Sequence, residues 1–262
     1  MLRPNAMKAR LAAGGAVSGM WVQSGSPVAA EIAARAGFDV VLIDLEHGHG
    51  DLDRLVHMIR AVQTTSATAM VRVPGKDPFT IGRVLDAGAE AVLIPLVADA
   101  REAERVAAFC RYPPRGVRGY AWPVIRASGY GLHPDRFARA NDEVLVAVQI
   151  ETATAAAEAA AIAALGEVDL LFVGPMDLAG SLGHPGDPAR PEVRELIRTV
   201  EEAVRDSGKP LGTIVRPDAD AATLLARGYR FVMAASDVVL LAQGAAAVAR
   251  ELRRLCEDGS GR

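Results

Sequence analysis

Eight short apolar runs, separated by segments with helical spacing, constrain the fold of this chain more than any other feature of its sequence. Most of the runs are nearly continuous Val, Ile and Leu without polar alternation, which is typical of strands buried on both faces of a parallel sheet. The runs lie at residues 16–22, 39–45, 68–73, 91–97, 144–151, 170–177, 211–215 and 231–236.

The segments between the runs predict crossover helices. Residues 27–37 have helical spacing and end on a glycine, and Asp51 can cap a helix over 51–63. A helix that ends in Ala-Gly or Arg-Gly and leads into a strand recurs at 34–43, 85–94 and 225–234. Eight such units predict an α/β fold, a closed (β/α)8 TIM barrel. An open doubly wound sheet is the alternative, but no GxGxxG follows the first strand.

The length of 262 residues, half of them hydrophobic, fits a single barrel domain over 1–262. Residues 111–142 interrupt the repeat and are rich in Gly, Pro, Arg and aromatics. Long irregular segments are uncommon in compact domains and often functional. The segment is either a surface excursion or oligomer contact, or a loop that borders a site. The chain is expected to end in a helix followed by a flexible C-terminal tail.

Composition excludes several classes of protein. The formal net charge is −3 with both signs mixed along the chain, so no basic stripe for nucleic acid is present. No apolar run reaches the roughly 20 residues of a membrane helix, and no signal peptide is evident. Cys110 and Cys256 have no CxxC spacing. A disulfide framework or a structural zinc site is therefore not expected. A location in the reducing cytoplasm is expected.

Polar residues follow several of the predicted strands, where a (β/α)8 barrel carries its active site. Because ionisable groups are costly to bury unpaired, their repeated placement at strand ends predicts a site. They are Asp44, Glu46 and His47 after the second strand, Arg72 after the third, Gln149 and Glu151 after the fifth, and Asp177 after the sixth.

Glu151 and Asp177 are the candidate metal ligands. Two carboxylates, waters and a chelating substrate complete an octahedral shell suited to Mg²⁺ or Mn²⁺. Taken alone, Asp177 could be a helix N-cap and Glu151 a loop carboxylate paired with an arginine. Their position at adjacent strand ends favours the metal site.

His47 is the candidate base, because histidine gains and loses a proton near neutral pH. Asp44 could orient its ring, and His49 could fill either role in the same loop. Arg72 is expected to bind a carboxylate or a developing enolate, since a planar guanidinium suits both. The alternative is a salt bridge from Arg72 to Glu46 or Glu151. The two arrangements are compatible with each other if the substrate joins this network.

The chain has only three lysines, Lys8, Lys76 and Lys209. A Schiff-base aldolase needs a lysine in its pocket with a depressed pKa. Lys209 precedes the seventh strand, on the wrong rim, and Lys76 in the PGKDP loop is expected to be mostly a solvated charge. The scarcity of lysine favours a metal ion as electron sink if carbanion chemistry occurs here.

Six motifs, in order between about residue 14 and about residue 250, carry a family resemblance. They are AGFDVVLIDLEHG, MVRVPG, VLDAGAEAVLIPLV, RYPPRGVRG, VQIET and LFVGPMDLAGSLG. Together they resemble the HpcH/HpaI family of class II 2-oxo acid aldolases. The resemblance implies a phosphoenolpyruvate/pyruvate-type barrel with a divalent metal (Mg²⁺, Mn²⁺ or Co²⁺), no organic cofactor, and a homohexamer built as a trimer of dimers.

The resemblance also implies roles for individual residues. Glu151 and Asp177 match metal ligands, and Arg72 matches the arginine that binds the pyruvyl oxygen. The other matches are the acid–base His47 with Asp44 behind it, Gln149 beside the metal, Asp86 reaching a neighbouring subunit's site, and the backbone of Gly174–Pro175 holding the pyruvate carboxylate. Two segments depart from the family pattern, EHGHGD at 46–51 and the bulky residues 119–123. Both are expected near the aldehyde side, so the aldehyde acceptor stays open.

The implied reaction is cleavage of a 4-hydroxy-2-oxo acid to pyruvate (or a substituted pyruvate such as hydroxypyruvate) and an aldehyde, with the reverse aldol addition. Decarboxylation of oxaloacetate, or lysis of a malyl- or citramalyl-CoA thioester, is possible on the same site. A non-catalytic 2-oxo acid binding protein is the alternative of another class. The full set of His47, Arg72, Glu151 and Asp177 argues against it, because a pure binder needs no base.

Overall fold

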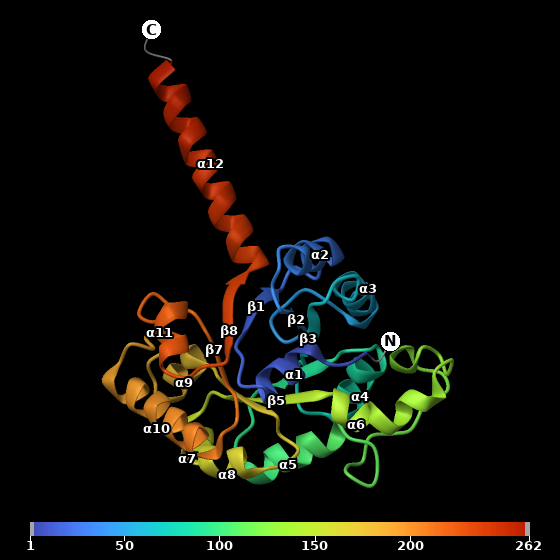
Figure 1. Cartoon of the computed structure of the whole chain (residues 1–262). Helices are drawn as coiled ribbons and strands as arrows, with labels where there is room; N and C mark the ends of the chain where they lie inside the picture. The colour runs from blue at the N-terminus through green and yellow to red at the C-terminus, as the bar shows by residue number, and fades with distance from the viewer. Residues whose placement is uncertain (1–2, 260–262) are drawn as a thin grey trace.

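Eight parallel strands close into a barrel in chain order, so the predicted (β/α)8 fold is confirmed (Figure 1). The structure is a computed structural model that describes residues 3–259. Each strand lies within one of the predicted apolar runs. The strands are β1 (Val17–Val22), β2 (Val40–Asp44), β3 (Thr68–Arg72), β4 (Ala91–Ile94), β5 (Leu145–Ile150), β6 (Leu170–Val173), β7 (Leu211–Ile214) and β8 (Phe231–Ser236).

The continuous apolar runs fit the barrel because both faces of its strands are buried. In β2, Val40 and Leu42 belong to the cluster that fills the barrel interior, whereas Val41 and Ile43 pack against the surrounding helices. The interior cluster also contains Met7 of α1 (Ala6–Ala12), a short helix that the sequence pattern did not predict. Helix α1 therefore contributes to the core at the amino-terminal end of the barrel.

Aspartate caps begin four of the outer helices, and the fourth of these caps is Asp220, which accepts from the Thr223 N–H. Asp51, Asp77 and Asp99 each accept a hydrogen bond from the backbone N–H three residues later, which satisfies a free donor of the first turn. The predicted cap at Asp51 is thus confirmed. The outer helices are α2 (Pro27–Arg35), α3 (Leu52–Val62), α4 (Pro78–Asp86), α5 (Ala100–Phe109), α7 (Ala153–Ala157), α8 (Ala159–Ala164), α9 (Pro175–Ser181), α10 (Pro191–Ser207) and α11 (Ala221–Ala226).

Residues 111–142 form an excursion on the outer flank of the barrel and not at the strand ends. The segment includes two 3-10 turns and α6 (Ala140–Glu143), and it builds a small core around Tyr112 and Trp122. Arg118 binds Asp86 of α4 at 2.7 Å, and Arg126 donates to the Ala87 carbonyl oxygen at 2.9 Å. Residues 119–123 therefore lie beside Asp86 on the outer flank and not at the strand ends of their own chain, and their place on an aldehyde side stays a prediction. The segment follows a helix, and the helices of this barrel end at its amino-terminal rim.

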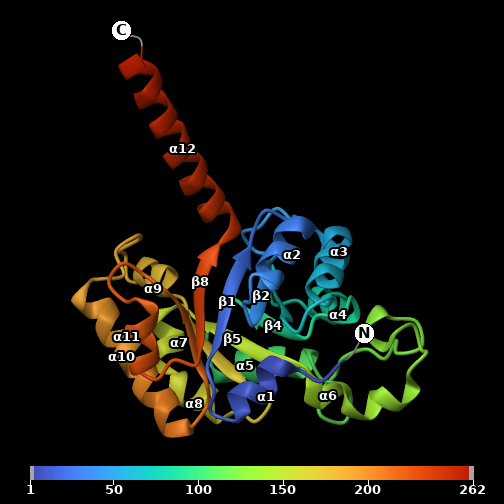
Figure 2. The same cartoon turned by 45° about the horizontal axis from the view of Figure 1, so that its top comes forward.

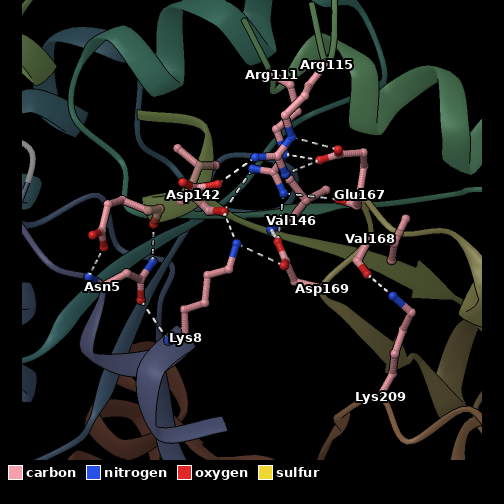
Figure 3. A network of polar contacts seen from close by, with 12 residues as sticks. Asn5, Lys8, Arg111, Arg115, Asp142, Val146, Glu167, Val168, Asp169 and Lys209 are labelled. Atoms are coloured by element: carbon pink, nitrogen blue, oxygen red, sulfur yellow. Dashed lines mark hydrogen bonds and ion pairs between the residues drawn. The ribbon is translucent and has the colours of Figure 1, made fainter. Parts of the chain in front are cut away.

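A charged network ties this rim together (Figure 3). The Arg111 side chain is fully buried and donates to Glu167 at 2.8 Å, to Asp169 at 2.9 Å and to the Val144 carbonyl oxygen at 2.9 Å. Arg115 contacts the same Glu167 from outside, with its side chain 40% exposed. The two arginines thus share a partner but differ in burial.

Replacing Arg111 by methionine is expected to lower the free energy of unfolding by roughly 2–3 kcal/mol, because its buried hydrogen bonds to charged groups are lost while Arg115 and Lys8 still pair with Glu167 and Asp169. The matched change Arg115→Met is expected to cost at most about 1 kcal/mol, since exposed ion pairs contribute little. Urea-induced unfolding followed by circular dichroism measures both. Equal losses for the two variants would contradict this account of the network.

Helix α12 (Asp237–Gly259) projects away from the barrel instead of packing on it (Figures 1 and 2). It confirms the predicted C-terminal helix through Gly259, while residues 260–262 of the predicted flexible tail lie outside the described residues. Its exposed apolar residues Leu241, Val248, Leu252 and Leu255 recur at heptad spacing. Between residues 3 and 259, no helix is long and apolar enough to cross a membrane.

Candidate active site

A bidentate ion pair joins the last residues of β2 and β3. The register of the two strands pairs Asp44 with Arg72. Arg72 Nε donates to Asp44 Oδ1 at 2.9 Å and Nη2 donates to Oδ2 at 2.6 Å, and both side chains are buried. A planar guanidinium held in this way has a fixed orientation at the carboxyl-terminal end of the barrel. The sequence prediction missed this pairing, although both residues end adjacent strands.

Two further contacts surround the Arg72 guanidinium. Nη1 lies 3.1 Å from Glu46 Oε2, so the predicted alternative of a salt bridge to Glu46 is confirmed. Trp21 stacks against the guanidinium at 4.5 Å from its ring centroid. The side chain is therefore held between two carboxylates and an aromatic ring.

Asp44 is fixed as an anion. Burial opposes its ionisation, but the hydrogen bonds and charge of Arg72, together with a bond from Gln23, hold the pKa of the carboxyl below its ordinary value. Gln23 Nε2 donates to Asp44 Oδ2 at 3.0 Å, and Gln23 Oε1 accepts from the Ser236 hydroxyl at 2.7 Å. Sequence reasoning missed Gln23, yet it follows the last residue of β1 and so obeys the same strand-end rule.

Asp44 does not orient the His47 ring as expected, because its carboxylate is occupied by Arg72 and Gln23. It accepts the backbone N–H of His47 at 3.2 Å, which fixes the turn. The carboxylate near the ring is Glu46, with Oε2 at 3.8 Å from His47 Nε2. Gly48 allows the turn, since a Cβ there would lie 2.1 Å from the Asp44 carbonyl oxygen. The imidazole, 63% exposed, is open to a ligand.

Glu151 is buried almost as completely as Asp44 and is oriented by two donors. Its Oε1 accepts the Leu96 N–H at 2.6 Å, and its Oε2 accepts Gln149 Nε2 in a short hydrogen bond. Burial raises the pKa of Glu151 to about 7. The charges of Asp177 and Glu46 also raise it, whereas the hydrogen bond from Leu96 and the charge of Arg72 lower it. A positive ion next to this carboxyl would therefore stabilise its ionised form.

Asp177 lies in the first turn of α9, where Gly174 is the N-cap, so the predicted alternative of an Asp177 cap is wrong. Gly174 leaves room for the acidic site, because a Cβ there would lie 3.0 Å from Gln149 Nε2 and from Glu151 Cβ. The Asp177 side chain itself lies on the exposed side of this turn. Its charge is near enough to raise the pKa of Glu151.

The residues at this rim fit a divalent cation. Glu46, Glu151 and Asp177 carry more negative charge than Arg72 balances, and the buried Gln149 Oε1 has no hydrogen-bond partner in the described chain. Within residues 3–259 no cluster of three His, Cys, Asp or Glu side chains is preassembled as a ligand set. Mg²⁺ is commonly held by one or two carboxylates with waters and substrate completing the shell, so Glu151 and Asp177 suffice.

Asp86 lies apart from this rim. It is the last residue of α4, and its carboxylate binds Arg118 on the outer flank next to the exposed rings of Phe79 and Tyr120. Within one chain, Asp86 is therefore not part of the strand-end site. The other candidates all lie at or just after the ends of β2, β3, β5 and β6. They are Asp44, His47, Arg72, Gln149, Glu151, Gly174, Pro175 and Asp177.

Comparisons with known proteins agree with this geometry. The profile of the HpcH/HpaI aldolase/citrate lyase family matches residues 17–244. The chain is 39% identical over 235 residues to a 5-keto-4-deoxy-D-glucarate aldolase of Klebsiella pneumoniae, covering 90% of this chain and 91% of the relative. It is 38% identical over 254 residues to a hydroxypyruvate/pyruvate aldolase of Cupriavidus necator, covering 97% and 94%. A solved HpcH/HpaI aldolase/citrate lyase family protein from Burkholderia cenocepacia superposes with a TM-score of 0.91 at 35% identity, covering 95% of this chain and 99% of that one.

Proposed function

The chain belongs to the HpcH/HpaI aldolase/citrate lyase family, and we propose that it is a divalent-metal-dependent aldolase acting on 4-hydroxy-2-oxo acids. The products are pyruvate, or a substituted pyruvate such as hydroxypyruvate, and an aldehyde, and the reverse aldol addition uses the same site. The observation that carries the proposal is the fixed, buried Arg72 beside the acidic pair Glu151 and Asp177. Arg72 thus places a positive charge next to the cation site, and an enolate needs such positive charge to stabilise its oxygen.

Glu151 and Asp177 would hold the cation, which is Mg²⁺, Mn²⁺ or Co²⁺. When bound, it supplies Lewis-acid stabilisation for the negative charge that develops on the 2-oxo acid. Arg72 donates its remaining N–H groups to the keto oxygen and so stabilises the same charge. The Gly174 N–H already donates to the Ile150 carbonyl oxygen and proline has no N–H, so the backbone N–H groups just after Gly174–Pro175, those of Met176 and Asp177, would hold the substrate carboxylate. Gln149 fixes the Glu151 carboxylate from its other side.

His47 moves the proton of the 4-hydroxyl group. When that proton leaves, the C4–O bond becomes a carbonyl, the C3–C4 bond breaks, and its electron pair forms the enolate of pyruvate. Protonation at C3 then completes cleavage. Glu46 is the carboxylate beside the ring, with Oε2 at 3.8 Å from His47 Nε2. His47 is a suitable proton carrier because its ring is exposed at the mouth of the barrel.

A retro-aldol screen tests the proposal. Purified enzyme is supplied with 4-hydroxy-2-oxo acids of different chain length and charge, and pyruvate release is measured with Mg²⁺, Mn²⁺ and Co²⁺. Oxaloacetate is assayed in parallel, with and without aldehyde. Metal-dependent release of both pyruvate and an aldehyde supports the aldolase. Turnover of oxaloacetate alone would identify a decarboxylase, and binding of pyruvate without any turnover would identify a 2-oxo acid binding protein.

Changing His47 to alanine is expected to lower kcat by about 10²–10⁴-fold, the usual contribution of a general acid–base group. His49→Ala is the matched control, because His49 lies in the same exposed loop and is expected to keep kcat within about tenfold. Pyruvate release under saturating Mg²⁺ measures both variants. If His49→Ala lowered kcat and His47→Ala did not, the base would be His49 and not His47.

We further infer that the chain assembles as a homo-oligomer, with a hexamer built as a trimer of dimers as the expected state. The support comes from α12, which projects from the barrel (Figure 2) and carries the exposed apolar stripe of Leu241, Val248, Leu252 and Leu255. Val28 and Ile32 of α2 are exposed beside Leu240 and Leu241 at its base. An exposed apolar stripe of this length marks an interaction surface, and a second copy offers the complementary one. In such an assembly Asp86 could serve the site of a neighbouring subunit.

Leu252→Glu is expected to weaken assembly into the oligomer, because it places a charge within the apolar stripe on α12. Glu251→Gln, at the adjacent position, is the control and should leave the assembly intact. Sedimentation velocity of the full chain measures the molar mass of each variant. A wild-type chain that sediments as a monomer would contradict this part of the proposal.

A further inference from the structure

Leu96 has an unusual backbone conformation next to the site. Its φ is +54°, and Tyr130 is the only other non-glycine residue with positive φ between residues 3 and 259. Tyr130 lies between Gly129 and Gly131 in the outer excursion, whereas Leu96 follows β4 at the carboxyl-terminal rim. Left-handed backbone is strained for a residue with a side chain, and it persists only where surrounding contacts enforce it.

Both backbone polar groups of Leu96 are occupied. Its N–H donates to Glu151 Oε1 at 2.6 Å, and its carbonyl oxygen accepts Lys76 Nζ at 2.7 Å. The strained residue thus lies directly between Lys76 and the buried Glu151 carboxylate. Its left-handed conformation aims the N–H at that carboxylate and leaves the carbonyl to the lysine.

Lys76 is itself anchored. Its ammonium also binds Glu102 Oε2 at 2.7 Å, and the same oxygen accepts the Ala98 N–H at 3.0 Å. Glu102 lies in the first turn of α5, which Asp99 caps. The loop after β4 is therefore held to the start of α5 by one lysine and one glutamate. Lys76 is not the solvated loop charge expected from the sequence, since its side chain is 30% exposed and its ammonium has two acceptors.

We propose that Lys76 is a positioning residue that fixes Leu96 in its left-handed conformation and thereby orients the Glu151 carboxylate for the cation. The inference rests on the proposed function, because it takes Glu151 as a metal ligand. Residues that orient a ligand from behind typically change metal affinity or activity by about 10–100-fold when they are removed. Loss of the Lys76 contact lets the loop relax toward an ordinary backbone conformation and withdraws the Leu96 N–H from Glu151.

The chain offers a matched control in Lys8. Lys8 Nζ donates to the Val144 carbonyl oxygen at 3.0 Å and pairs with Asp169 at 3.0 Å, with a side chain 28% exposed. Lys8 and Lys76 thus make the same kinds of contact at similar burial. Lys8 belongs to the amino-terminal network with Asp169 and Arg111, at the opposite end of the barrel (Figure 3). A structural cost common to both lysines should therefore appear in both variants.

The test compares Lys76→Met with Lys8→Met in the full-length chain. Mn²⁺ is titrated into each protein in the absence of substrate, and its dissociation constant is measured by electron paramagnetic resonance of the free ion. Lys76→Met is expected to weaken Mn²⁺ binding by about tenfold or more. Lys8→Met should match the wild type, and Lys76→Arg, which can donate to the same two acceptors, should restore most of the affinity. In turnover assays, Lys76→Met should raise the Mn²⁺ concentration for half-maximal rate more than it lowers kcat at saturation.

The outcomes separate the inference from the proposed function. If the wild type binds no Mn²⁺, or Glu151→Gln binds it as well as the wild type, the metal site itself is wrong. If the wild type binds, Glu151→Gln does not, and Lys76→Met binds like Lys8→Met, the positioning role is overturned. Should Lys76→Met fail to fold, Glu102→Gln replaces it. That variant keeps the lysine but weakens its anchor, and it should shift Mn²⁺ affinity in the same direction.

Discussion

Replacing Arg72 by methionine is expected to abolish measurable retro-aldol activity and to lower the free energy of unfolding by about 3–5 kcal/mol. The reason is that Arg72 has two roles. It is the charge partner of the buried Asp44, with bonds of 2.9 and 2.6 Å, and it is the positive group nearest the proposed enolate. The variant leaves Asp44 buried without compensation. Urea unfolding and pyruvate release from the same preparation measure the two effects.

Arg72→Lys separates the two roles. Lysine keeps the charge but cannot form the bidentate pair with Asp44 or present a planar group to the keto oxygen. The variant is expected to stay folded and to lose about 10²–10³-fold in kcat, the range for removal of one donor to a developing oxyanion. A lysine variant with full activity would show that only charge matters at this position. It would remove the geometric argument for the enolate role.

Glu151→Gln is expected to remove divalent-cation binding and to lower the retro-aldol rate by about 10³-fold or more, since a Lewis acid stabilises developing charge by several kcal/mol. The amide still fits the space beside Gly174 and can still accept the Leu96 N–H. Fold stability should therefore change little, or even rise, because burial and two nearby acids disfavour the Glu151 charge. Thermal unfolding without metal checks this.

Removing the cation from the wild type should reproduce the loss. Dialysis against a chelator is expected to abolish turnover, and added Mg²⁺, Mn²⁺ or Co²⁺ should restore it in the wild type but not in Glu151→Gln. Added Mn²⁺ should also raise the thermal midpoint of the wild type alone, since ligands stabilise the state they bind. Chelated wild type that keeps its full activity would end the metal proposal.

The barrel was predictable because its signals are local. Strands buried on both faces leave uninterrupted runs such as 39–45 and 91–97, and the helices between them carry capping aspartates. Helix α1 was not predictable in this way. It has only seven residues, and its position depends on Met7 entering the interior core formed by distant strands.

The candidate site was partly predictable for the same reason. Strand ends converge on one rim in any (β/α)8 barrel, so the polar residues after each run identified Arg72, Glu151 and Asp177. Their pairing was not predictable from position along the chain. Asp44 binds Arg72 because the β2–β3 register aligns the two residues, whereas sequence proximity had suggested His47.

The sequence by itself determined the eight-strand barrel, the rim that carries the acids and the arginine, and the scarcity of lysine that favours a metal ion over a Schiff base. These follow from side-chain patterns that repeat along the chain. Only the tertiary structure decided that Arg72 is bound to Asp44, that the 119–123 segment lies on the outer flank, and that Lys76 reaches Glu151 through the left-handed Leu96. Such contacts depend on strand register and loop conformation, which the packing of segments far apart in the sequence fixes together.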